Sequence, residues 1–398
     1  MGTKNETLAF INGGRSCFGC GACAAVCPGE ALRMTPDADG FSCPEIDFAK
    51  CVKCGKCRRA CPVNLSSPTP DRDPEFYSVR HKEREIREKS TSGGAFTALS
   101  DVVLARGGAV AGAVWTPDFQ VRHAVALASD PAARDAMRGS KYVQSDTSGV
   151  FPEVKKLLDS GKEVLFSGTP CQVAALYAFL GEKGGGEGLV TVDFICHGAP
   201  SPKVFQAYLR ELSARRGSAV RQVRCRDGKL GCVPMRIGVD FADGSTYLED
   251  CEHDFYFRLF LSGIINRRAC AACPYTCVRR GSDLTIADNW RFASFAPEWD
   301  DNTGVSTLLV NTPRGAALLR AAAAALEVRK CTLGDIDQHY LHRPGGPHPD
   351  RDLFFRALAK RGFTAAAADF TRPRPLWRRI RSRLLKLLGR KPGNEGKL

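Results

Sequence analysis

The sequence predicts a mixed fold, of the α+β and α/β classes, in which a small cysteine-rich domain precedes a larger α/β body with antiparallel hairpins. One observation behind this prediction is a cysteine motif that occurs twice within the first 70 residues. Another is the alternation of short β-like runs with helical patterns through most of the remaining chain. With 398 residues, 43% of them hydrophobic, the chain can form two or three domains with cores of their own.

The first domain is expected over residues 1–70, where the spacing Cys-x2-Cys-x2-Cys-x3-Cys-Pro occurs twice. Its cysteines are Cys17, Cys20, Cys23 and Cys27 in the first copy and Cys51, Cys54, Cys57 and Cys61 in the second. This run is typical of bacterial ferredoxins with two [4Fe–4S] clusters, in which the fourth cysteine of each run binds the other cluster. The crossed scheme assigns Cys17, Cys20, Cys23 and Cys61 to the first cluster and Cys51, Cys54, Cys57 and Cys27 to the second. The motif therefore predicts a dicluster domain that transfers electrons.

Two other uses of these cysteines fit the spacing less well. Structural zinc sites use separate CxxC pairs and close one four-ligand site at a time. Disulfides between residues three apart in tight turns are rare, and nothing in the sequence indicates export. Iron–sulfur chemistry is therefore the preferred interpretation.

The second domain is expected over residues 71–345, after a linker at Pro68-Thr69-Pro70-Asp71. Strands are predicted at 109–115, 121–127, 162–166, 189–195, 284–287 and 305–310. Helices are predicted at 80–89, 96–104, 171–180, 202–214 and 315–326. Alternation over 221–248, around Asp243-Gly244, predicts antiparallel hairpins. Residues 326–370 are only weakly patterned, and a C-terminal region is assigned to 346–398.

Two glycine-containing segments of this body resemble anion-binding helix starts. Ser167-Gly168-Thr169-Pro170 follows a predicted buried strand, with Thr169 at a plausible N-cap and Pro170 at the first helical position. Ser92-Gly93-Gly94 precedes another predicted helix in a similar way. A helix start of this kind presents free N–H groups to a cofactor phosphate, although ordinary helix capping explains either segment alone.

Further cysteines suggest a third cluster. Cys270-x2-Cys273-x3-Cys277, together with Cys196 after a predicted strand, supplies enough thiolates for one. The alternative is that they are buried free cysteines, which are common in protein cores.

These motifs together resemble the coenzyme F420 hydrogenase/dehydrogenase beta-subunit family. The resemblance rests on Ser92-Gly93-Gly94, Gly139-Ser140-Lys141-Tyr142-Val143-Gln144-Ser145, Phe166-Ser167-Gly168-Thr169-Pro170-Cys171-Gln172, Cys196-His197-Gly198-Ala199-Pro200-Ser201, Cys270-x2-Cys273 and Asp283-Leu284-Thr285-Ile286-Ala287-Asp288-Asn289-Trp290. It implies an iron–sulfur flavoprotein that holds a flavin, FAD, in the α/β domain. The implied flavin-site candidates are Ser92, Gly93, Gly94, Ser140, Lys141, Ser167, Gly168 and Thr169. The implied ligands of the third [4Fe–4S] cluster are Cys196, Cys270 and Cys273, with Cys171 or Cys277 as the fourth.

The chain departs from this family at one motif. The family usually has Gly-Asp-Phe-Trp-Gly where this chain has Ala287-Asp288-Asn289-Trp290-Arg291. The loss of both glycines affects the expected substrate pocket more than the fold, because backbone can approach a ligand closely only where side chains are absent.

The expected function is that of a flavin-dependent iron–sulfur oxidoreductase. A flavin would exchange a hydride with a deazaflavin or another organic substrate and pass single electrons to or from the clusters. No catalytic residue is predicted. The alternative is an electron-transfer subunit without a substrate site of its own, which serves a partner enzyme, for example in polysaccharide biosynthesis. Either role requires an electron-donor or electron-acceptor protein, or a redox partner subunit.

The net charge of +14 is concentrated at the C-terminus. Residues 372–398 contain ten Lys or Arg and one Glu, so they carry +9 of that charge, and they predict a short basic amphipathic helix. No nucleic-acid partner is expected, because the excess positive charge is concentrated in this tail. The N-terminus predicts no signal peptide, so a cytoplasmic location is expected, and the tail suggests a peripheral position at the inner face of the cell membrane.

Overall fold

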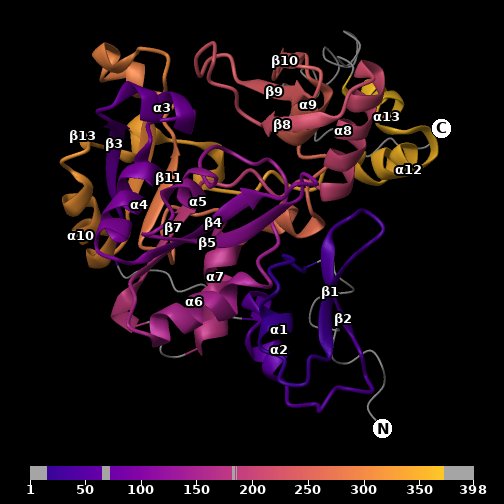
Figure 1. The fold of residues 1–398 in the computed structure, drawn as a ribbon, viewed down its shortest axis with the longest axis horizontal. Coiled ribbons are helices and arrows are strands. Elements are labelled where there is room, and N and C mark those ends of the chain that lie inside the picture. The colour runs from indigo at the N-terminus through magenta and orange to yellow at the C-terminus, as the bar shows by residue number, and fades with distance from the viewer. Residues whose placement is uncertain (1–15, 65–71, 182–183, 185, 372–398) are drawn as a thin grey trace, which may run out of the picture.

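The structure is a computed structural model that describes residues 16–64, 72–181, 184 and 186–371. Its parts are a small N-terminal domain, a large mixed sheet with helices on both faces, and a second sheet with its own helices (Figure 1). The linker predicted at 68–71 and the basic helix predicted within 372–398 lie outside the described residues. In the part of the chain that is described, no helix is long and apolar enough to cross a membrane.

The N-terminal domain contains one hairpin and two short helices related by the repeated motif. Strand β1 (Leu32–Pro36) pairs antiparallel with β2 (Ser42–Ile46). Helices α1 (Ala22–Ala25) and α2 (Lys56–Arg59) each begin after a glycine in the left-handed conformation, with φ of 72° at Gly21 and 71° at Gly55. Glycine adopts this backbone conformation without steric cost, so each cysteine run can turn sharply into its helix. The 3-10 helix η2 (Pro62–Asn64) follows.

The large sheet contains eight strands in the order β13-β3-β12-β11-β7-β6-β4-β5. Their bounds are Glu75–His81 for β3, Ala109–Trp115 for β4, Val121–Leu127 for β5, Val164–Ser167 for β6, Leu189–Phe194 for β7, Leu284–Asp288 for β11, Ser306–Val310 for β12 and Leu326–Cys331 for β13. Strands β4, β6, β7 and β11 are parallel, and their carboxyl ends meet at one edge. Strand β3 also ends there, because it is antiparallel to β12, which is antiparallel to β11.

Helices cover both faces of this sheet because its buried strands alternate apolar side chains between the faces. Leu165 on β6 packs with Leu99 of α4 (Ala95–Ala105) and Leu318 of α10 (Pro313–Ala322). Its neighbour Phe166 packs on the opposite face with α6 (Val150–Asp159) and α7 (Pro170–Leu180). Shorter helices at this sheet are α3 (Arg84–Ser90), α5 (Pro131–Asp135) and α11 (Leu333–Ile336).

The second sheet has the order β10-β9-β8 and supports a separate hydrophobic core. Its strands are β8 (Val220–Arg224), β9 (Arg236–Phe241) and β10 (Thr246–Asp250), and its helices are α8 (Pro202–Arg216), α9 (Phe255–Ser262), α12 (Arg351–Arg361) and α13 (Phe363–Thr371). Fully buried aromatic side chains from α8, α9, α12 and α13 meet in this core. The two helices after residue 345 are therefore integral to it. Phe41, from the β1–β2 hairpin, is also buried there with 2% exposure.

Short 3-10 helices connect these elements. They are η4 (Gly186–Gly188), η5 (Arg268–Ala272), η6 (Phe292–Ser294), η7 (Pro297–Trp299) and η8 (His339–Leu341).

Most predicted body elements are present, and the main differences lie at its edges. The helix predicted over 80–89 begins four residues later, since its first two residues belong to strand β3. The helix predicted over 315–326 ends at Ala322, and Leu326 starts β13, which pairs with β3. Both differences arise because strand pairing between distant segments competes with the local helical pattern.

Candidate functional site

The first copy of the cysteine motif surrounds a cavity of about 340 Å³. Four thiol-bearing residues line it, Cys17, Cys20, Cys23 and Cys61, and the remaining lining residues are mainly apolar. Cys61 comes from the second copy of the motif. The cavity therefore brings together the four residues that the crossed scheme assigns to the first cluster.

Backbone N–H groups point at these sulfur atoms. Gly19 donates a hydrogen bond of 3.3 Å to Cys17 Sγ. Burial raises the pKa of Cys20 to about 12. The backbone N–H of Ala22 opposes this shift, whereas the neighbouring Cys23 and Cys61 thiols add to it. Such buried thiols are costly to ionise alone, whereas metal coordination deprotonates a thiol and N–H groups stabilise the resulting thiolate. The cavity therefore fits an anionic thiolate set around a metal cluster.

The second group of four cysteines lies nearer the surface. Burial raises the pKa of Cys57, and its thiol also interacts with those of Cys54, Cys27 and Cys51. Ala31 donates a hydrogen bond of 3.3 Å to Cys27 Sγ. Cys54 is exposed and the other three are partly buried. These residues are the set that the crossed scheme assigns to the second cluster.

The spacing of the thiols argues against single metal ions. Over the described ranges, the one group of three potential ligand side chains whose atoms all lie within 4.8 Å of one another is Glu249, Asp250 and His253, which contains no cysteine. Ligands of a single zinc ion crowd around one centre, whereas the corners of a cubane hold its thiolates farther apart.

A third group of cysteines forms at the junction of three elements. Cys171 lies in the first turn of α7, Cys196 follows β7, Cys270 lies in η5, and Cys273 follows η5. Burial raises the pKa of Cys171 well above its usual value, and the Cys273, Cys196 and Cys270 thiols add to this. Gly198 donates 3.3 Å to Cys196 Sγ and Ala199 donates 3.4 Å to Cys270 Sγ. The third group therefore shares two features with the first, namely buried thiols with a raised pKa and backbone N–H groups that donate to sulfur.

Cys277, the other candidate for the fourth position, lies near Cys273 of this group but is not among the thiols that shift the pKa of Cys171 or Cys196. Its thiol donates to the Arg279 carbonyl at 2.8 Å, and burial raises its pKa, with Arg280 and Asp193 as the charged neighbours. It lines a separate cavity of about 300 Å³ with the buried pair Asp193 and Arg280. The grouping of thiols favours Cys171 over Cys277.

Tyr275 lies between the first and third groups. Burial raises its pKa, and the nearby thiols that contribute are Cys171 and Cys273 of the third group and Cys20 and Cys61 of the first. Its ring also packs edge-on against that of Phe18, with centroids 5.7 Å apart. One buried aromatic side chain therefore separates the two groups.

Six of the eight predicted flavin-site residues fall into two places at the carboxyl edge of the large sheet. Ser92, Gly93 and Gly94 lie at the start of α4, beside the last residues of β3 and the first residue of β12. A Cβ on Gly93 would lie 2.4 Å from both the Ser306 nitrogen and the Val79 oxygen, so glycine is required here by the sheet itself.

Ser167, Gly168 and Thr169 lie at the end of β6, and three strands separate β6 from β3. These two helix starts are therefore too far apart to hold one phosphate. Thr169 forms a capping box with Gln172, as its predicted N-cap position implies, and its hydroxyl lies 3.1 Å from Cys171 Sγ. This segment adjoins the third cysteine group.

Ser140 and Lys141 lie in the loop after α5. Lys141 Nζ donates to the carbonyls of Met137, Arg138 and Gly139 at 3.0–3.3 Å. Burial lowers its pKa to about 8. The ammonium group therefore stabilises the loop, and Arg138, which donates to Thr97 Oγ1 at 3.0 Å, lies closer to the first turn of α4.

Arg226, which the sequence did not single out, connects residues of two of the quoted motifs. Arg226 forms an ion pair with Asp288 and lies over the Trp290 ring, 5.3 Å from its centroid. Burial raises the pKa of Tyr142 to about 12, and its charged neighbours are Arg226 and Asp288. Asp288 and Trp290 belong to the altered motif, whereas nothing in the spacing of Arg226 marks it.

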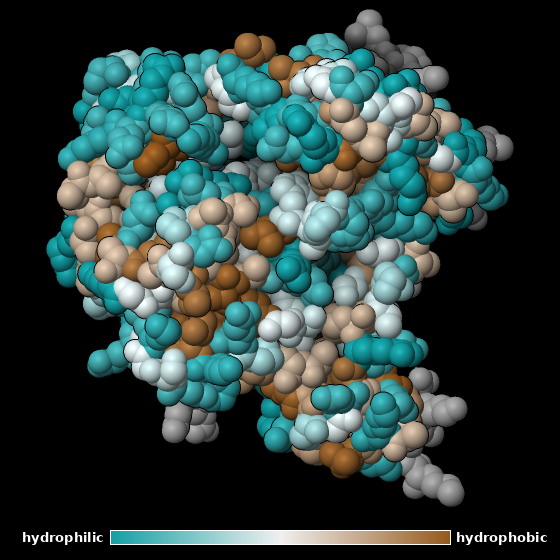
Figure 2. Space-filling view, in the orientation of Figure 1, coloured by the Kyte–Doolittle hydropathy of each residue, from teal (hydrophilic) through white to brown (hydrophobic). Residues whose placement is uncertain are grey.

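Aromatic rings lead from the third cysteine group toward Arg226. Tyr142 stacks on Phe260 with centroids 4.4 Å apart, and Phe260 lies 6.0 Å from His197, which follows Cys196. Figure 2 shows a hollow between the part of the surface that carries α3 and the part formed by β8–β10. The carboxyl edge of the large sheet faces this region.

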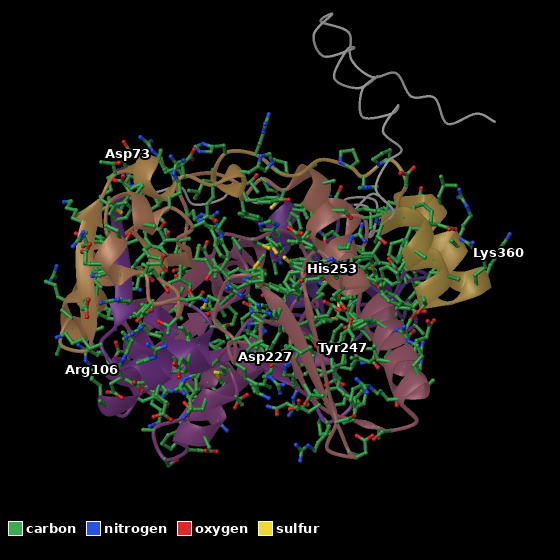
Figure 3. All side chains as sticks on the ribbon, turned by 90° about the horizontal axis from the view of Figure 1, so that it is seen from above. Asp73, Arg106, Asp227, Tyr247, His253 and Lys360 are labelled. Carbon is green, nitrogen blue, oxygen red and sulfur yellow. The ribbon has the colours of Figure 1, made fainter. Side chains whose placement is uncertain are left out.

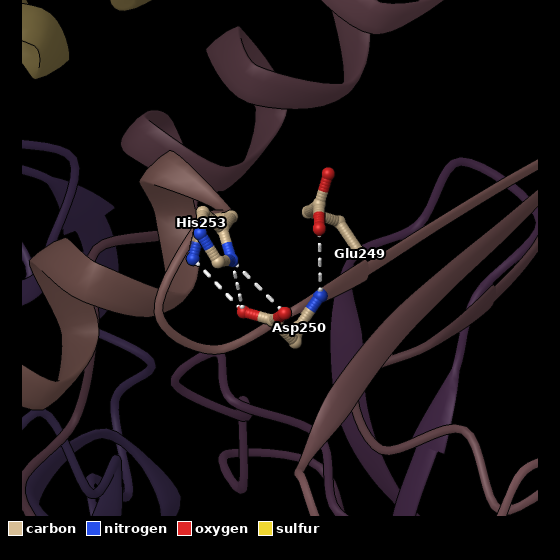
Figure 4. Close-up of side chains that lie close together, drawn as sticks. All are labelled: Glu249, Asp250 and His253. Atoms are coloured by element: carbon tan, nitrogen blue, oxygen red, sulfur yellow. Dashed lines mark hydrogen bonds and ion pairs between the residues drawn. The ribbon is translucent and has the colours of Figure 1, made fainter.

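The group of Glu249, Asp250 and His253 has a structural explanation (Figure 4). Asp250 Oδ1 accepts backbone hydrogen bonds from Glu252 and His253, which shapes the turn between β10 and α9. His253 Nδ1 lies 2.8 Å from the same oxygen, and its side chain is 70% exposed. This group is a turn on the surface.

The grouped thiols and the mixed sheet define the class of this molecule as an iron–sulfur protein with an α/β body. Three family models match the chain: a 4Fe-4S dicluster domain at residues 16–65, the N-terminal part of the coenzyme F420 hydrogenase/dehydrogenase beta subunit at 76–151, and its C-terminal part at 161–334. The chain belongs to the coenzyme F420 hydrogenase/dehydrogenase beta-subunit family and carries an N-terminal dicluster domain.

Among solved structures, the chain is similar to one chain of the xenon-derivatised F420-reducing [NiFe] hydrogenase complex from Methanosarcina barkeri. The two are 18% identical, with a TM-score of 0.45, over 84% of this chain and all of the other. The comparison with curated proteins returned no match.

Proposed function

We propose that this protein is an iron–sulfur flavoprotein oxidoreductase in which single electrons pass through three [4Fe–4S] clusters to or from a flavin. The observation that carries the proposal is the position of buried Tyr275, whose pKa is raised by burial and by thiols of both the first and the third cysteine groups. Clusters on either side of one side chain can exchange electrons without a mobile carrier. The clusters would therefore act in series.

The proposed ligand sets follow the observed groups. They are Cys17, Cys20, Cys23 and Cys61 for the first cluster, Cys51, Cys54, Cys57 and Cys27 for the second, and Cys171, Cys196, Cys270 and Cys273 for the third. The N–H donors at Cys17, Cys27, Cys196 and Cys270 would stabilise the thiolates and raise the reduction potential of each cluster.

We place the flavin, as FAD, at the carboxyl edge of the large sheet between α4 and the Arg226–Asp288 pair. When bound, it would supply the exchange between hydride chemistry and single-electron transfer. The start of α4 offers a positive helix end, and Arg138 lies beside its first turn. Thr91 Oγ1 is buried there without a hydrogen-bond partner among the described residues, which fits an additional polar ligand.

The substrate is proposed to be a deazaflavin or another organic hydride acceptor. One observation favours the alternative of an electron-transfer subunit without its own substrate site. Asp288 is already paired with Arg226, and Ala287 and Arg291 occupy the two usual glycine positions of this motif. A partner enzyme would then hold the substrate.

The decisive experiment is anaerobic purification of the full chain, followed by iron and flavin analysis. The reaction of the purified protein with a reduced deazaflavin, alone and with a redox partner, is then measured. We expect about twelve iron atoms and one flavin for each chain. Protein that binds flavin but reacts only with a partner present would support the alternative, and protein with clusters but no flavin after reconstitution would disprove the flavoprotein assignment.

The basic tail is proposed to contact an anionic membrane surface or a partner subunit. Sedimentation with anionic liposomes distinguishes the two, since only membrane binding should carry the full chain into the pellet at low salt. A chain that ends at Thr371 is the control.

A further inference from the structure

The surface beside the second cysteine group combines exposed sulfur with positive charge. We call it the second-cluster face and define it by the exposed residues around Cys54. Its cations are Lys50, Lys53, Lys56, Arg58 and Arg59. Apolar side chains lie among them, with Phe48 44% and Val52 67% exposed.

The positive charge of this face is largely uncompensated. Asp47 is the one acidic residue between 47 and 59, and it lies 4.0 Å from Lys50. Within the described ranges, no carboxylate lies within 4.0 Å of Lys53, Lys56 or Arg58. The ammonium and guanidinium groups are therefore available to an external partner.

Arg59 links the charge to the candidate electron-transfer site. Its Nη2 donates 3.3 Å to the carbonyl of Cys54, the most exposed of the four cysteines. The first cysteine group, by contrast, is buried against the rest of the protein. Electrons from outside would thus meet the second cluster first, at the centre of the basic face.

We propose that the second-cluster face is the docking site for an acidic, one-electron carrier protein of the ferredoxin type. The inference rests on the proposed function, because it requires a cluster at Cys27, Cys51, Cys54 and Cys57. Opposite charges steer the two proteins together, and exposed Phe48 and Val52 supply a small apolar contact around the cluster. One electron leaves the reduced carrier and enters the second cluster, so the carrier departs oxidised and no proton is transferred.

A protein partner fits this face better than a small organic substrate. Cys54 lines neither the cavity at the first group nor the one beside Cys277. Electron-transfer complexes are small, polar and short-lived, and they depend on charge complementarity more than on buried area.

The test is stopped-flow reduction of the anaerobic holoprotein by a reduced dicluster ferredoxin of net negative charge. The variant K53E/K56E/R58E reverses three charges and leaves the cysteines and Arg59 unchanged. We expect its second-order rate constant to fall at least about tenfold at low salt. The rate for the unaltered protein should fall as ionic strength rises, and that for the variant should not.

A matched control reverses three charges elsewhere. R210E/R356E/K360E changes exposed residues on α8 and α12, and Lys360 lies at the right-hand edge of the molecule in Figure 3. This variant should keep the ferredoxin rate within about twofold. Equal iron content in all proteins verifies that the clusters are present.

A viologen that carries one sulfonate group, so that its one-electron-reduced form has no net charge, separates docking from internal electron transfer. It should reduce all three proteins at the same rate. If the ferredoxin rate is unchanged in K53E/K56E/R58E, or falls equally in the matched control, the docking inference is wrong while the proposed function stands. If viologen cannot reduce the unaltered protein, the proposed electron path is itself wrong.

Discussion

Arg267 donates a hydrogen bond of 2.9 Å from Nη1 to the backbone carbonyl of Cys17, across 250 residues of sequence. Its Nη2 donates 2.7 Å to the Ser42 carbonyl, and its Nε donates 2.9 Å to Gln144 Oε1. The guanidinium also lies over the Phe41 ring, 4.9 Å from its centroid. One buried side chain from the α/β body therefore joins both the hairpin and the first cysteine run of the dicluster domain.

Replacing Arg267 with Met should loosen the dicluster domain. The change removes charge-assisted hydrogen bonds to two carbonyls in a buried interface, for an expected loss of about 2–4 kcal/mol in local stability. Native-state hydrogen exchange at the paired β1 and β2 amides measures this loss. Arg268→Met is the control, because Arg268 is exposed and its ion pair with Asp352 should contribute less than about 1 kcal/mol. Equal protection in both variants would contradict the prediction.

Replacing Cys171 with Ser should remove the third cluster, whereas Cys277→Ser should retain it. The first change takes one ligand from the observed group of four thiols, and the second removes a thiol that faces another cavity. Anaerobic iron analysis should give about eight iron atoms for the first variant and about twelve for the second. The opposite result would restore Cys277 as the fourth ligand.

His123 should make stability depend on pH. Burial lowers its pKa to about 4, with Nε2 2.9 Å from the Ser167 carbonyl and Nδ1 2.9 Å from Ser145 Oγ. His123 of the unfolded state binds a proton near pH 6.5, whereas in the folded state it does so only near pH 4. The contribution of neutral, buried His123 to the free energy of unfolding is therefore complete above pH 6.5 and is lost as the pH falls toward 4. Between pH 7 and pH 5 the loss should be about 2 kcal/mol.

Anaerobic denaturant unfolding of the holoprotein at both pH values checks this, with His123→Gln as the comparison. The variant should lose less stability between pH 7 and pH 5 than the unaltered protein. His253→Gln should differ in the opposite sense, because Asp250 raises the pKa of exposed His253. If the pH dependence of stability is identical with and without His123, His123 is not its cause.

Removing Arg226 should weaken flavin binding if the flavin lies beside the Arg226–Asp288 pair. The double variant R226M/D288N removes the pair without leaving a buried charge alone, so the fold should be retained. We expect flavin affinity to fall about tenfold or more with the iron content unchanged. Titration of the flavin-free protein with flavin measures this affinity. Unchanged affinity would place the flavin elsewhere.

The grouping of the N-terminal cysteines could be predicted from sequence because local spacing largely determines it. Cys17, Cys20 and Cys23 lie within one tight turn and helix, and the motif implies that Cys61 joins them. Strands 109–115 and 121–127 were likewise predicted at their observed bounds, since each is a continuous apolar or alternating run.

Other features could not be read from the sequence because they depend on distant segments. Arg267 and Tyr275 acquire their roles only when the dicluster domain packs against the body. The choice between Cys171 and Cys277 depends on how α7 approaches η5. The weakly patterned segment 326–370 begins with strand β13, and its last part forms helices because α12 and α13 complete a core that α8 and α9 begin. The separation of Ser92–Gly94 from Ser167–Thr169 follows from strand order, which local motifs do not encode.

Exposure decreases from the second cysteine group, which contains exposed Cys54, to the first group, which contains buried Cys20. Dioxygen dissolved in water would therefore attack the outermost cluster first, and the inner ones would survive longer. On the proposed function, damage to the outer cluster would disconnect the protein from its electron carrier while the proposed substrate site stayed intact. Oxidising conditions would then stop the inflow of electrons before they destroyed the interior of the protein.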